Sequence, residues 1–219
     1  MIGTCGKCGN HKWDKIVKDG RVICPECNHS WNYVSLPLFI LSGCSGVGKT
    51  TTGIELIQRQ NDVVVLDADI FCGVQNASSE EDYRKRVDTL EALSRNISQS
   101  GKPVLWTMAG NLDMLPRSYN TRFFSGIYCL VLTVDDDALR ERMTNGRGIT
   151  DSGWIGGSVG YNRYLRTHNT LGELSYETLD ITDKTPAEVA DAVIEWYKKE
   201  VAKLKVILDS YGVKDADKL

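Results

Sequence analysis

An eight-residue stretch, GCSGVGKT at residues 43–50, fits the pattern G-x-x-x-x-G-K-[ST] at every position. An apolar run at 38–41 precedes it and a helical pattern follows it, which is the strand–loop–helix context that this pattern requires. Glycines let backbone N–H groups turn inward around a phosphate, and the positive end of the helix dipole attracts the same charge. The stretch therefore predicts an α/β fold with a phosphate-binding loop, and a chance glycine-rich turn is the less favoured interpretation.

The residues of this loop are expected to bind a nucleotide. The Lys49 ammonium would reach the β- and γ-phosphates, and the Thr50 hydroxyl would bind Mg²⁺. Thr51 and Thr52 begin the helix, and a contact of Thr51 with the α-phosphate is left open. The expected nucleotide-binding residues are Gly43, Ser45, Gly46, Val47, Gly48, Lys49, Thr50 and Thr51.

Two carboxylates, Asp67 and Asp69, follow the next apolar run at 63–66, which we interpret as a buried parallel strand. Ligands of open α/β sheets gather at the carboxyl ends of the strands. Asp67 is the candidate to hold Mg²⁺, usually through water, and Asp69 is the candidate to orient or deprotonate an attacking hydroxyl. The alternative is that one aspartate caps the following helix and the other is solvated.

The third apolar run, at 103–106, leads into TMAGN (107–111) and has no acid at its end. A strand at this position usually ends in a carboxylate that holds the metal. Its absence gives Asp67 more weight as the magnesium ligand, and the small residues leave room for a substrate near the loop. Asn111 and Asp113 are either substrate contacts or turn residues.

A glycine-rich segment with arginines follows the fourth apolar run at 126–132. Residues 146–160 contain six glycines, so we expect a mobile lid over about residues 142–168. Arginines brought over the γ-phosphate would stabilise the charge that develops during transfer, and Arg142 and Arg147 are the candidates for this catalytic role. An exposed loop with solvated arginines is the alternative, and for Arg163 and Arg166 both interpretations stay open.

The N-terminal part of the chain differs from the rest, with two C-x-x-C pairs and almost no apolar run. Fifteen residues separate the pairs, which lies within the recognised range for a structural zinc site. A hairpin turning at Asp19-Gly20 would bring the pairs together, so residues 1–35 resemble a zinc ribbon. Four free cysteines, or a redox pair outside its usual βαβ context, are less favoured. The expected zinc ligands are Cys5, Cys8, Cys24 and Cys27.

The charge of the ribbon bears on its role. Residues 1–35 carry five basic and three acidic side chains, and four thiolates with one zinc ion bring the sum close to zero. This small net charge gives the ribbon little electrostatic attraction for phosphate groups. We therefore expect a structural or docking role, with folding that depends on the metal, rather than nucleic-acid binding. We also expect the hydrophobic core of the ribbon to be separate from that of the following domain.

Composition excludes several classes of protein. The 219 residues carry a net charge of −3, with 42% hydrophobic and 25% charged residues, so the chain has no general attraction to nucleic acid or anionic membranes. No apolar run approaches the roughly 18 residues of a membrane span, and the first 30 residues contain no signal-peptide pattern. Cysteines paired for metal binding indicate a reducing compartment. We expect a cytoplasmic protein, and its oligomeric state is not determined.

Residues 37–200 resemble small-molecule kinases of the P-loop kinase superfamily, of the shikimate and gluconate kinase type and of the bacterial nucleoside and nucleotide kinase type. The resemblance rests on GCSGVGKT (43–50), DAD (67–69), the acid-free VLWTMAGN (104–111), LRERMTNGR (139–147) and LDITDKTPAEV (179–189). It implies a kinase domain over residues 36–219, built as a three-layer α/β/α fold with a parallel sheet of order 2-3-1-4-5. It also implies a D-x-D pair that holds magnesium and the substrate hydroxyl, and lid arginines that close on ATP. The ribbon and Met108-Ala109, where shikimate kinases carry further glycines, depart from the family pattern.

These observations predict a phosphotransferase that uses ATP, Mg²⁺ and Zn²⁺ and acts on a hydroxyl of a small acceptor, with a nucleoside as one candidate. Two alternatives stay open. One is a nucleotide-gated NTPase or binding module, in which hydrolysis acts as a timer. The other is a kinase of nucleic-acid ends or modified bases positioned by the ribbon, which the near-neutral charge of the ribbon does not favour. The residues identify neither the acceptor nor a preference for ATP over GTP.

Overall fold

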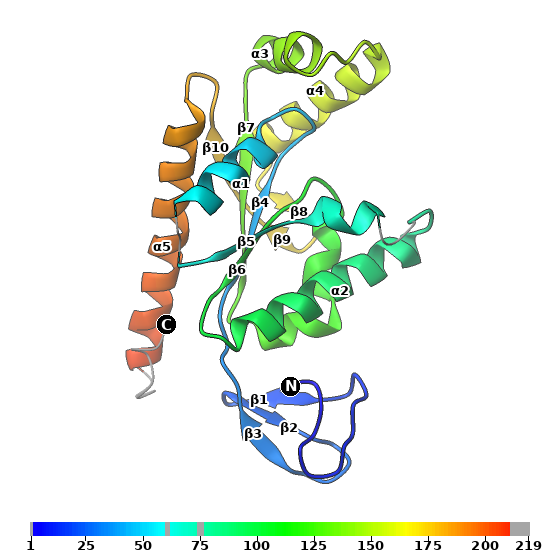
Figure 1. Cartoon of the computed structure of the whole chain (residues 1–219), viewed down its shortest axis with the longest axis vertical. Coiled ribbons are helices and arrows are strands. Elements are labelled where there is room, and N and C mark those ends of the chain that lie inside the picture. The colour runs from blue at the N-terminus through cyan, green and yellow to red at the C-terminus, as the bar shows by residue number, and fades with distance from the viewer. Residues whose placement is uncertain (1, 60–61, 74–76, 211–219) are drawn as a thin grey trace.

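A computed structural model of the chain describes residues 2–59, 62–73 and 77–210, with side chains up to 203. The N-terminal part forms an antiparallel sheet of three short strands, β1 (Ile16–Lys18), β2 (Arg21–Ile23) and β3 (Ser30–Asn32) (Figure 1). Asp19 and Gly20, with φ of 49° and 70°, join β1 to β2. Two consecutive positive φ angles are what a type I′ hairpin requires, so the expected turn is confirmed.

The main sheet contains β4 (Leu38–Ser42), β5 (Val64–Asp67), β6 (Val104–Thr107), β7 (Ile127–Thr133) and β10 (Glu177–Asp180). Its order is β10-β7-β4-β6-β5, and each neighbouring pair is parallel. Counted within this sheet, the order is 2-3-1-4-5, as the resemblance implied. The expectation of a buried second strand is wrong, because β5 lies at the edge of the sheet and its four residues are only half-buried.

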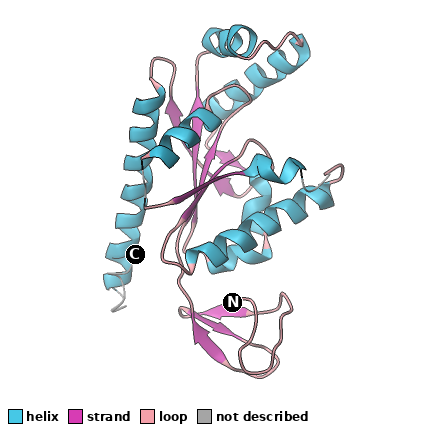
Figure 2. Ribbon diagram, in the orientation of Figure 1, coloured by secondary structure: helices cyan, strands magenta, loops and turns pink. Residues whose placement is uncertain are grey.

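Helices cover both faces of this sheet (Figure 2). Successive β4 side chains point to opposite faces: Phe39 and Leu41 pack with α1 (Lys49–Gln58) and α5 (Pro186–Ser210), whereas Leu38 and Ile40 pack with α2 (Glu80–Ser98). The remaining segments are η1 (Ala68–Gly73), η2 (Leu112–Arg117), η3 (Tyr119–Phe123), α3 (Asp136–Glu141), η4 (Arg142–Gly146), α4 (Ser152–Thr167) and the hairpin β8 (Thr170–Leu171)–β9 (Leu174–Ser175). The three-layer arrangement is therefore confirmed. Among the helices that the structure describes, none combines the length and apolar character needed to cross a bilayer.

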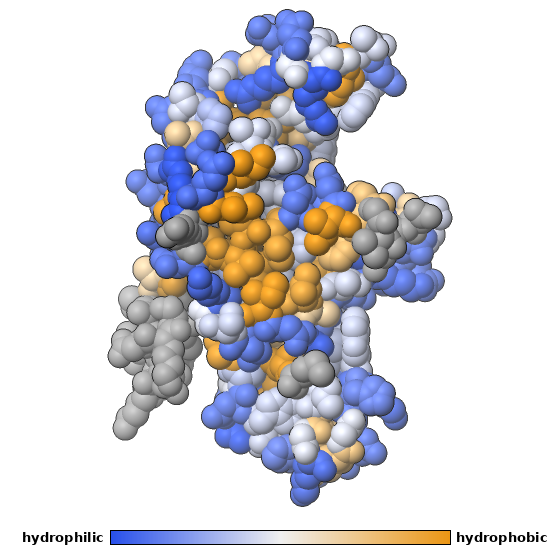
Figure 3. Space-filling view, in the orientation of Figure 1, coloured by the Kyte–Doolittle hydropathy of each residue, from blue (hydrophilic) through white to orange (hydrophobic). Residues whose placement is uncertain are grey.

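The first helix leaves part of its apolar pattern exposed. Leu56 of α1 is fully buried, but Ile54 and Ile57 are 51% and 62% exposed, and Ile70 of η1 is 51% exposed. Figure 3 shows apolar residues gathered on this face of the molecule, where α1 and β5 lie in Figure 1. The sequence pattern of α1 therefore predicts the helix, but it does not show which apolar positions face inward.

The ribbon shares its core with the following α/β domain, which corrects the expectation of two separate hydrophobic systems. Ile2 and Val22 of the ribbon pack in one buried cluster with Phe123 of η3. The Trp13 ring stacks on Tyr119 with centroids 5.9 Å apart. A three-stranded ribbon is too small to bury its own aromatic residues, so the segment before β7 completes its core.

The glycine-rich segment is largely helical, although we expected a mobile loop. Four of its six glycines lie in α4, whose Ile155, Val159 and Leu165 are buried. The Asp151 carboxylate caps this helix by accepting a hydrogen bond from the Trp154 N–H at 2.9 Å. Packing of this apolar face outweighs the cost of about 1 kcal/mol that each glycine brings to a helix. Closure of residues 142–168 as a lid stays a prediction.

Candidate active site

The carboxyl ends of β4, β5 and β6 open into a cavity of about 880 Å³. The cavity is lined by residues 45–52, both aspartates of the D-x-D pair, the end of β6 and the two arginines of the expected lid. Lys184, Pro186 and Val189 border it from the loop after β10 and the start of α5. The structure thus brings expected site residues from three separate segments to one cavity, which two further segments complete.

The phosphate-binding loop needs its glycines for two different reasons. Gly43, Gly46 and Gly48 have φ of 143°, 81° and 123°, in the region that side chains disfavour. A Cβ on Gly43 would also lie 2.6 Å from the carbonyl oxygen of Leu132, so no side chain fits beneath the loop. Gly43 therefore shapes the turn below the cavity, whereas the other expected loop residues line the cavity itself.

Lys49 begins α1 and holds its ammonium group inside the loop. Its Nζ donates hydrogen bonds to the carbonyl oxygens of Gly43 at 2.9 Å and Cys44 at 2.8 Å. Burial lowers the pKa of Lys49, and the Cys44 thiol and the carboxylates of Asp69 and Asp67 act in the opposite direction. The negative charge of a bound polyphosphate would also favour the charged form of Lys49. The loop therefore holds a positive charge where it can stabilise phosphate.

The two aspartates occupy distinct environments. Asp67 is half-buried, and its Oδ1 accepts a hydrogen bond from the backbone N–H of Asp69 at 2.9 Å. That bond caps the first turn of η1, so the capping role considered for one aspartate is present at Asp67. Asp69 is exposed and lines the same cavity. Asp67 is thus oriented by the backbone, whereas Asp69 faces an incoming molecule.

The acid-free end of β6 also contributes to the cavity. Thr107, Met108 and Ala109 line it, and the strand register places Thr107 beside Asp67. Asn111 has φ of 61° and precedes the first turn of η2. The turn interpretation therefore fits Asn111, because asparagine tolerates this conformation better than most residues.

The two arginines of the expected lid make different contacts. Arg142 donates to the carbonyl oxygens of Val47 at 3.0 Å and Ile181 at 3.2 Å, which ties the phosphate-binding loop to the loop after β10. Arg147 is exposed and donates to the Ser45 hydroxyl at 3.2 Å. Arg147 can approach a phosphate without breaking a backbone contact, and this favours it over Arg142 for the catalytic role.

Three further contacts concern the arginines of this segment. The Arg147 guanidinium lies 5.9 Å from the ring centroid of Trp154, a cavity residue that sequence reasoning missed. The only signal for Trp154 was a single large aromatic residue among many glycines. Arg163 and Arg166 form ion pairs with Asp136 and Asp135 on the surface, so the solvated interpretation fits both arginines.

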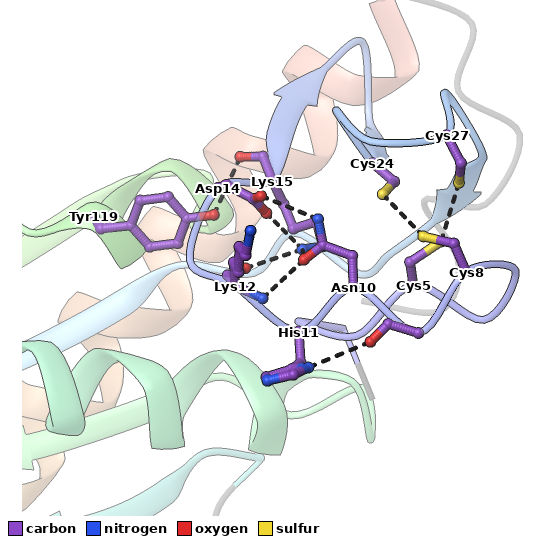
Figure 4. A network of polar contacts seen from close by, with 11 residues as sticks. Cys5, Cys8, Asn10, His11, Lys12, Asp14, Lys15, Cys24, Cys27 and Tyr119 are labelled. Atoms are coloured by element: carbon purple, nitrogen blue, oxygen red, sulfur yellow. Dashed lines mark hydrogen bonds and ion pairs between the residues drawn. The ribbon is translucent and has the colours of Figure 1, made fainter.

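The two cysteine pairs converge in the ribbon (Figure 4). The Sγ atoms of Cys5, Cys8, Cys24 and Cys27 all lie within 4.8 Å of one another, and two of the separations are 3.6 and 3.7 Å. A zinc ion with bonds of about 2.3 Å to four sulfurs places neighbouring sulfurs about 3.8 Å apart. The donor set and spacing therefore fit zinc.

The backbone supports this arrangement in the same way at both pairs. The Gly9 and Asn28 N–H groups donate at 2.9 Å to the carbonyl oxygens of Cys5 and Cys24, the first cysteine of each pair. The His29 ring stacks on Trp31, with centroids 5.8 Å apart, and lies outside the cysteine cluster. Four thiols thus form the cluster without a histidine, as expected.

A magnesium site also fits the residues present. The Thr50 side chain is exposed at the start of α1, and the Asp67 carboxylate lines the same cavity. Thr107 is 3% exposed, and across the described ranges its hydroxyl has no hydrogen-bond partner. Two oxygen ligands and an unpaired buried hydroxyl are suitable partners for Mg²⁺ and the waters it retains.

Comparison with known proteins supports the fold. No family model matches the chain, and no curated protein matches it in sequence. Among solved structures it is similar to a sugar kinase from a Janibacter species, with a TM-score of 0.56, 15% identity, and coverage of 75% of this chain and 95% of that one. The fold is that of the P-loop kinases.

Two further structures give the same result. A gluconokinase from Sinorhizobium meliloti aligns with a TM-score of 0.54 and 13% identity, over 79% of this chain and 97% of that one. The tunicamycin resistance protein of Deinococcus radiodurans aligns with a TM-score of 0.53 and 18% identity, over 74% of this chain and 95% of that one. At these identities the likeness establishes the fold, and activity has to be argued from the site.

Proposed function

We propose that this protein transfers the γ-phosphoryl group of ATP to a hydroxyl of a small acceptor. One observation carries the proposal: the exposed carboxylate of Asp69 lines the same cavity as Lys49 and Arg147. A general base, a fixed cation and a second cation at one phosphate-binding loop are the groups that phosphoryl transfer requires. The similar structures of a sugar kinase and a gluconokinase agree with this chemistry.

The transfer step follows from these positions. The acceptor oxygen forms a bond to the γ-phosphorus, and the bond between that phosphorus and its bridging oxygen breaks, so the electron pair leaves on ADP. Asp69 orients the hydroxyl and takes its proton. Lys49 and Arg147 stabilise the charge that develops on the phosphoryl oxygens. Arg142 supports this arrangement by holding the loop in place.

Magnesium would be held by Thr50 and, through water, by Asp67. When bound, Mg²⁺ would supply positive charge that offsets the negative charge of the phosphates. The backbone N–H of Asp69 keeps the Asp67 carboxylate in one orientation, as its 2.9 Å hydrogen bond to Oδ1 shows. The two aspartates therefore have separate roles, one toward the metal and one toward the acceptor.

The acceptor end of the cavity favours a ring-bearing substrate, and a nucleoside is our candidate. Met108 and Ala109 add apolar side chains to the cavity lining, and Trp154, which also lines the cavity, leaves 49% of its surface exposed. A planar ring can stack on an exposed indole.

We propose that the four cysteines bind zinc and that the ribbon has a structural role. Lys15, counted among the basic residues of the ribbon, is 1% exposed and donates at 2.7 Å to the Asp14 carboxylate. Burial of the Lys15 ammonium beside the partly exposed Asp14 removes one positive charge from the surface. Phosphate contacts would need such charges, so the structural role is favoured over nucleic-acid binding.

Two matched variants test the proposed function. Asp69→Asn should leave the affinity for Mg²⁺–ATP nearly unchanged and lower transfer to the acceptor by about 10²–10⁴-fold, the span for loss of a general base. Asp67→Asn should instead raise the Mg²⁺ concentration needed for activity. Swapped results would mean that the two roles are reversed. Small and equal effects at both positions, with ATP hydrolysis unaltered, would reject the kinase and favour a nucleotide-gated module.

A further inference from the structure

Two buried hydroxyls lie at the carboxyl ends of neighbouring strands. Ser42 ends β4 and is fully buried, and Thr107 ends β6 and is 3% exposed. Within the described residues neither side-chain oxygen has a hydrogen-bond partner. A buried hydroxyl without a partner costs about 1–3 kcal/mol, so folded proteins keep few of them. Each of the two therefore requires an explanation.

The surroundings of Thr107 place it between the expected magnesium ligands. In the strand register Thr107 lies beside Asp67 of β5. A Cβ on Gly53 of α1 would lie 3.2 Å from the Thr107 methyl group, so this side chain packs directly beneath α1. Gly53 is three residues after Thr50, which puts both on the same side of the helix.

The two hydroxyls differ in their access to the active site. Thr107 is among the residues that line the cavity, together with Thr50 and Asp67. Ser42 is not among them and lies deeper in the core, between β6 and β7. Of the two residues, only Thr107 therefore borders the space that a ligand of the cavity would fill.

We propose that Thr107 positions the magnesium ion of bound Mg²⁺–ATP, by forming a hydrogen bond to a water molecule of the metal's first shell. This inference rests on the proposed function and adds a residue to it. Mg²⁺ retains several of its waters in nucleotide sites, and each of them needs a partner. The neutral hydroxyl of Thr107 provides a partner for one of these waters at the end of β6, where an acid is absent. Asp67 then supplies the carboxylate of the magnesium site.

The reason for a hydroxyl here is electrostatic. The cavity already contains the carboxylates of Asp67 and Asp69, one residue apart along the chain. A third carboxylate at position 107 would add like-charge repulsion to this pair. It would also oppose the negative charge that develops on the acceptor oxygen as the hydroxyl loses its proton.

The test compares three variants by nucleotide binding. Thr107→Val keeps the shape of the side chain and removes the hydroxyl, Thr107→Ser keeps the hydroxyl, and Ser42→Ala removes the other unpaired hydroxyl. Binding of ATP is measured by calorimetry across a Mg²⁺ titration and again in buffer without added Mg²⁺, because a strong chelator would also remove zinc from the ribbon. Loss of an indirect metal partner typically weakens metal affinity by about 10–100-fold. We expect Thr107→Val to raise the half-saturating Mg²⁺ concentration by that factor and to leave metal-free ATP binding unchanged.

The other variants and a stability measurement complete the test. Thr107→Ser should bind within about threefold of the wild type, and Ser42→Ala should be indistinguishable from it. Because Thr107→Val removes an unpaired hydroxyl, the melting temperature of the protein without Mg²⁺ should stay constant or rise.

Three results would overturn the inference. An unchanged Mg²⁺ titration with a raised KM for the acceptor would show that Thr107 contacts the acceptor instead. A lower melting temperature with an unchanged titration would show a structural role. A Mg²⁺ effect of equal size in Ser42→Ala would point to a general disturbance of the strand ends. If the wild-type protein does not bind Mg²⁺–ATP at all, the proposed function fails instead, so the two failures are distinguishable.

Discussion

Replacing Phe123 by alanine should uncouple the ribbon from the α/β domain. Phe123 is 1% exposed and packs with Ile2 and Val22 of the ribbon. The Tyr33 ring meets it edge-on at 6.0 Å, and the Arg95 guanidinium lies 4.7 Å from its ring centroid. The side chain thus fills the interface between the two parts.

The magnitude follows from these contacts. Truncation of a buried phenylalanine to alanine costs about 3–5 kcal/mol. Loss of the cation–π contact adds about 1–2 kcal/mol at a desolvated site. The total is a large fraction of the roughly 5–15 kcal/mol that stabilises a typical domain. Phe123→Ala should therefore lower the melting temperature and release zinc at lower denaturant concentration than the wild type.

The assay follows secondary structure by circular dichroism and zinc release with a chromogenic chelator in the same denaturant series. In the wild type the two transitions should coincide, and in Phe123→Ala zinc release should come first. Phe71→Ala serves as the control, because Phe71 is partly buried and stacks on the core residue Trp106 of the α/β domain at 5.7 Å, away from the ribbon. It should lower stability without separating the transitions. Separate transitions in the wild type, or a loss below about 1 kcal/mol in Phe123→Ala, would refute the shared core.

Three further predictions concern single residues. Burial raises the pKa of Glu91 to about 8, so its carboxyl stays protonated in the folded state and stability should fall by up to ~1.4 kcal/mol per pH unit as pH rises from about 4.5 to 8. Denaturation of Glu91→Gln across that range should show a flatter profile, and an equal slope would contradict the assignment. Lys49→Ala should weaken ATP binding and lower turnover together, and less than about a threefold change in both would refute the loop assignment. Arg147→Ala should lower kcat by at least about 10-fold with little effect on ATP affinity, whereas Arg142→Ala should reduce the melting temperature as well, because Arg142 holds three backbone carbonyls.

The parts of the fold that sequence reasoning predicted are those determined by local pattern. The glycine-rich loop before α1 and the Asp19-Gly20 hairpin depend on backbone conformations that few other residues adopt. The parallel strand order came from a family resemblance carried by short motifs. Such features can be read without knowing what the rest of the chain contacts.

The features that sequence reasoning missed depend on contacts between distant segments. Phe123 lies in a short 3₁₀ segment without periodicity, so nothing in its neighbourhood indicates that it faces the ribbon. The glycines of α4 favour a loop locally, but burial of Ile155 and Val159 against the core stabilises the helix. The half-exposure of β5 follows from its edge position, which its apolar composition does not reveal.

The sequence predicts which residue types come together at the cavity. It is less informative about which role each of these residues takes. The motifs place Lys49, Thr50 and the aspartates at one sheet edge, because the carboxyl ends of parallel strands meet there. Which arginine is available to a phosphate depends on backbone carbonyls that Arg142 contacts and Arg147 does not. The partnerless hydroxyl of Thr107 becomes visible only when all its neighbours are in place.

The measurement that tests the central claim most directly is the fate of the γ-phosphate. The protein is incubated with ATP, Mg²⁺ and a panel of nucleosides, nucleotides, sugars and oligonucleotides, and the products are identified by phosphorus NMR and mass spectrometry. The account predicts that at least one small hydroxyl-bearing compound is converted to its phosphate ester in equal amount to the ADP formed, and that Asp69→Asn abolishes this product. Formation of ADP and inorganic phosphate alone, unaffected by any small acceptor, would contradict it.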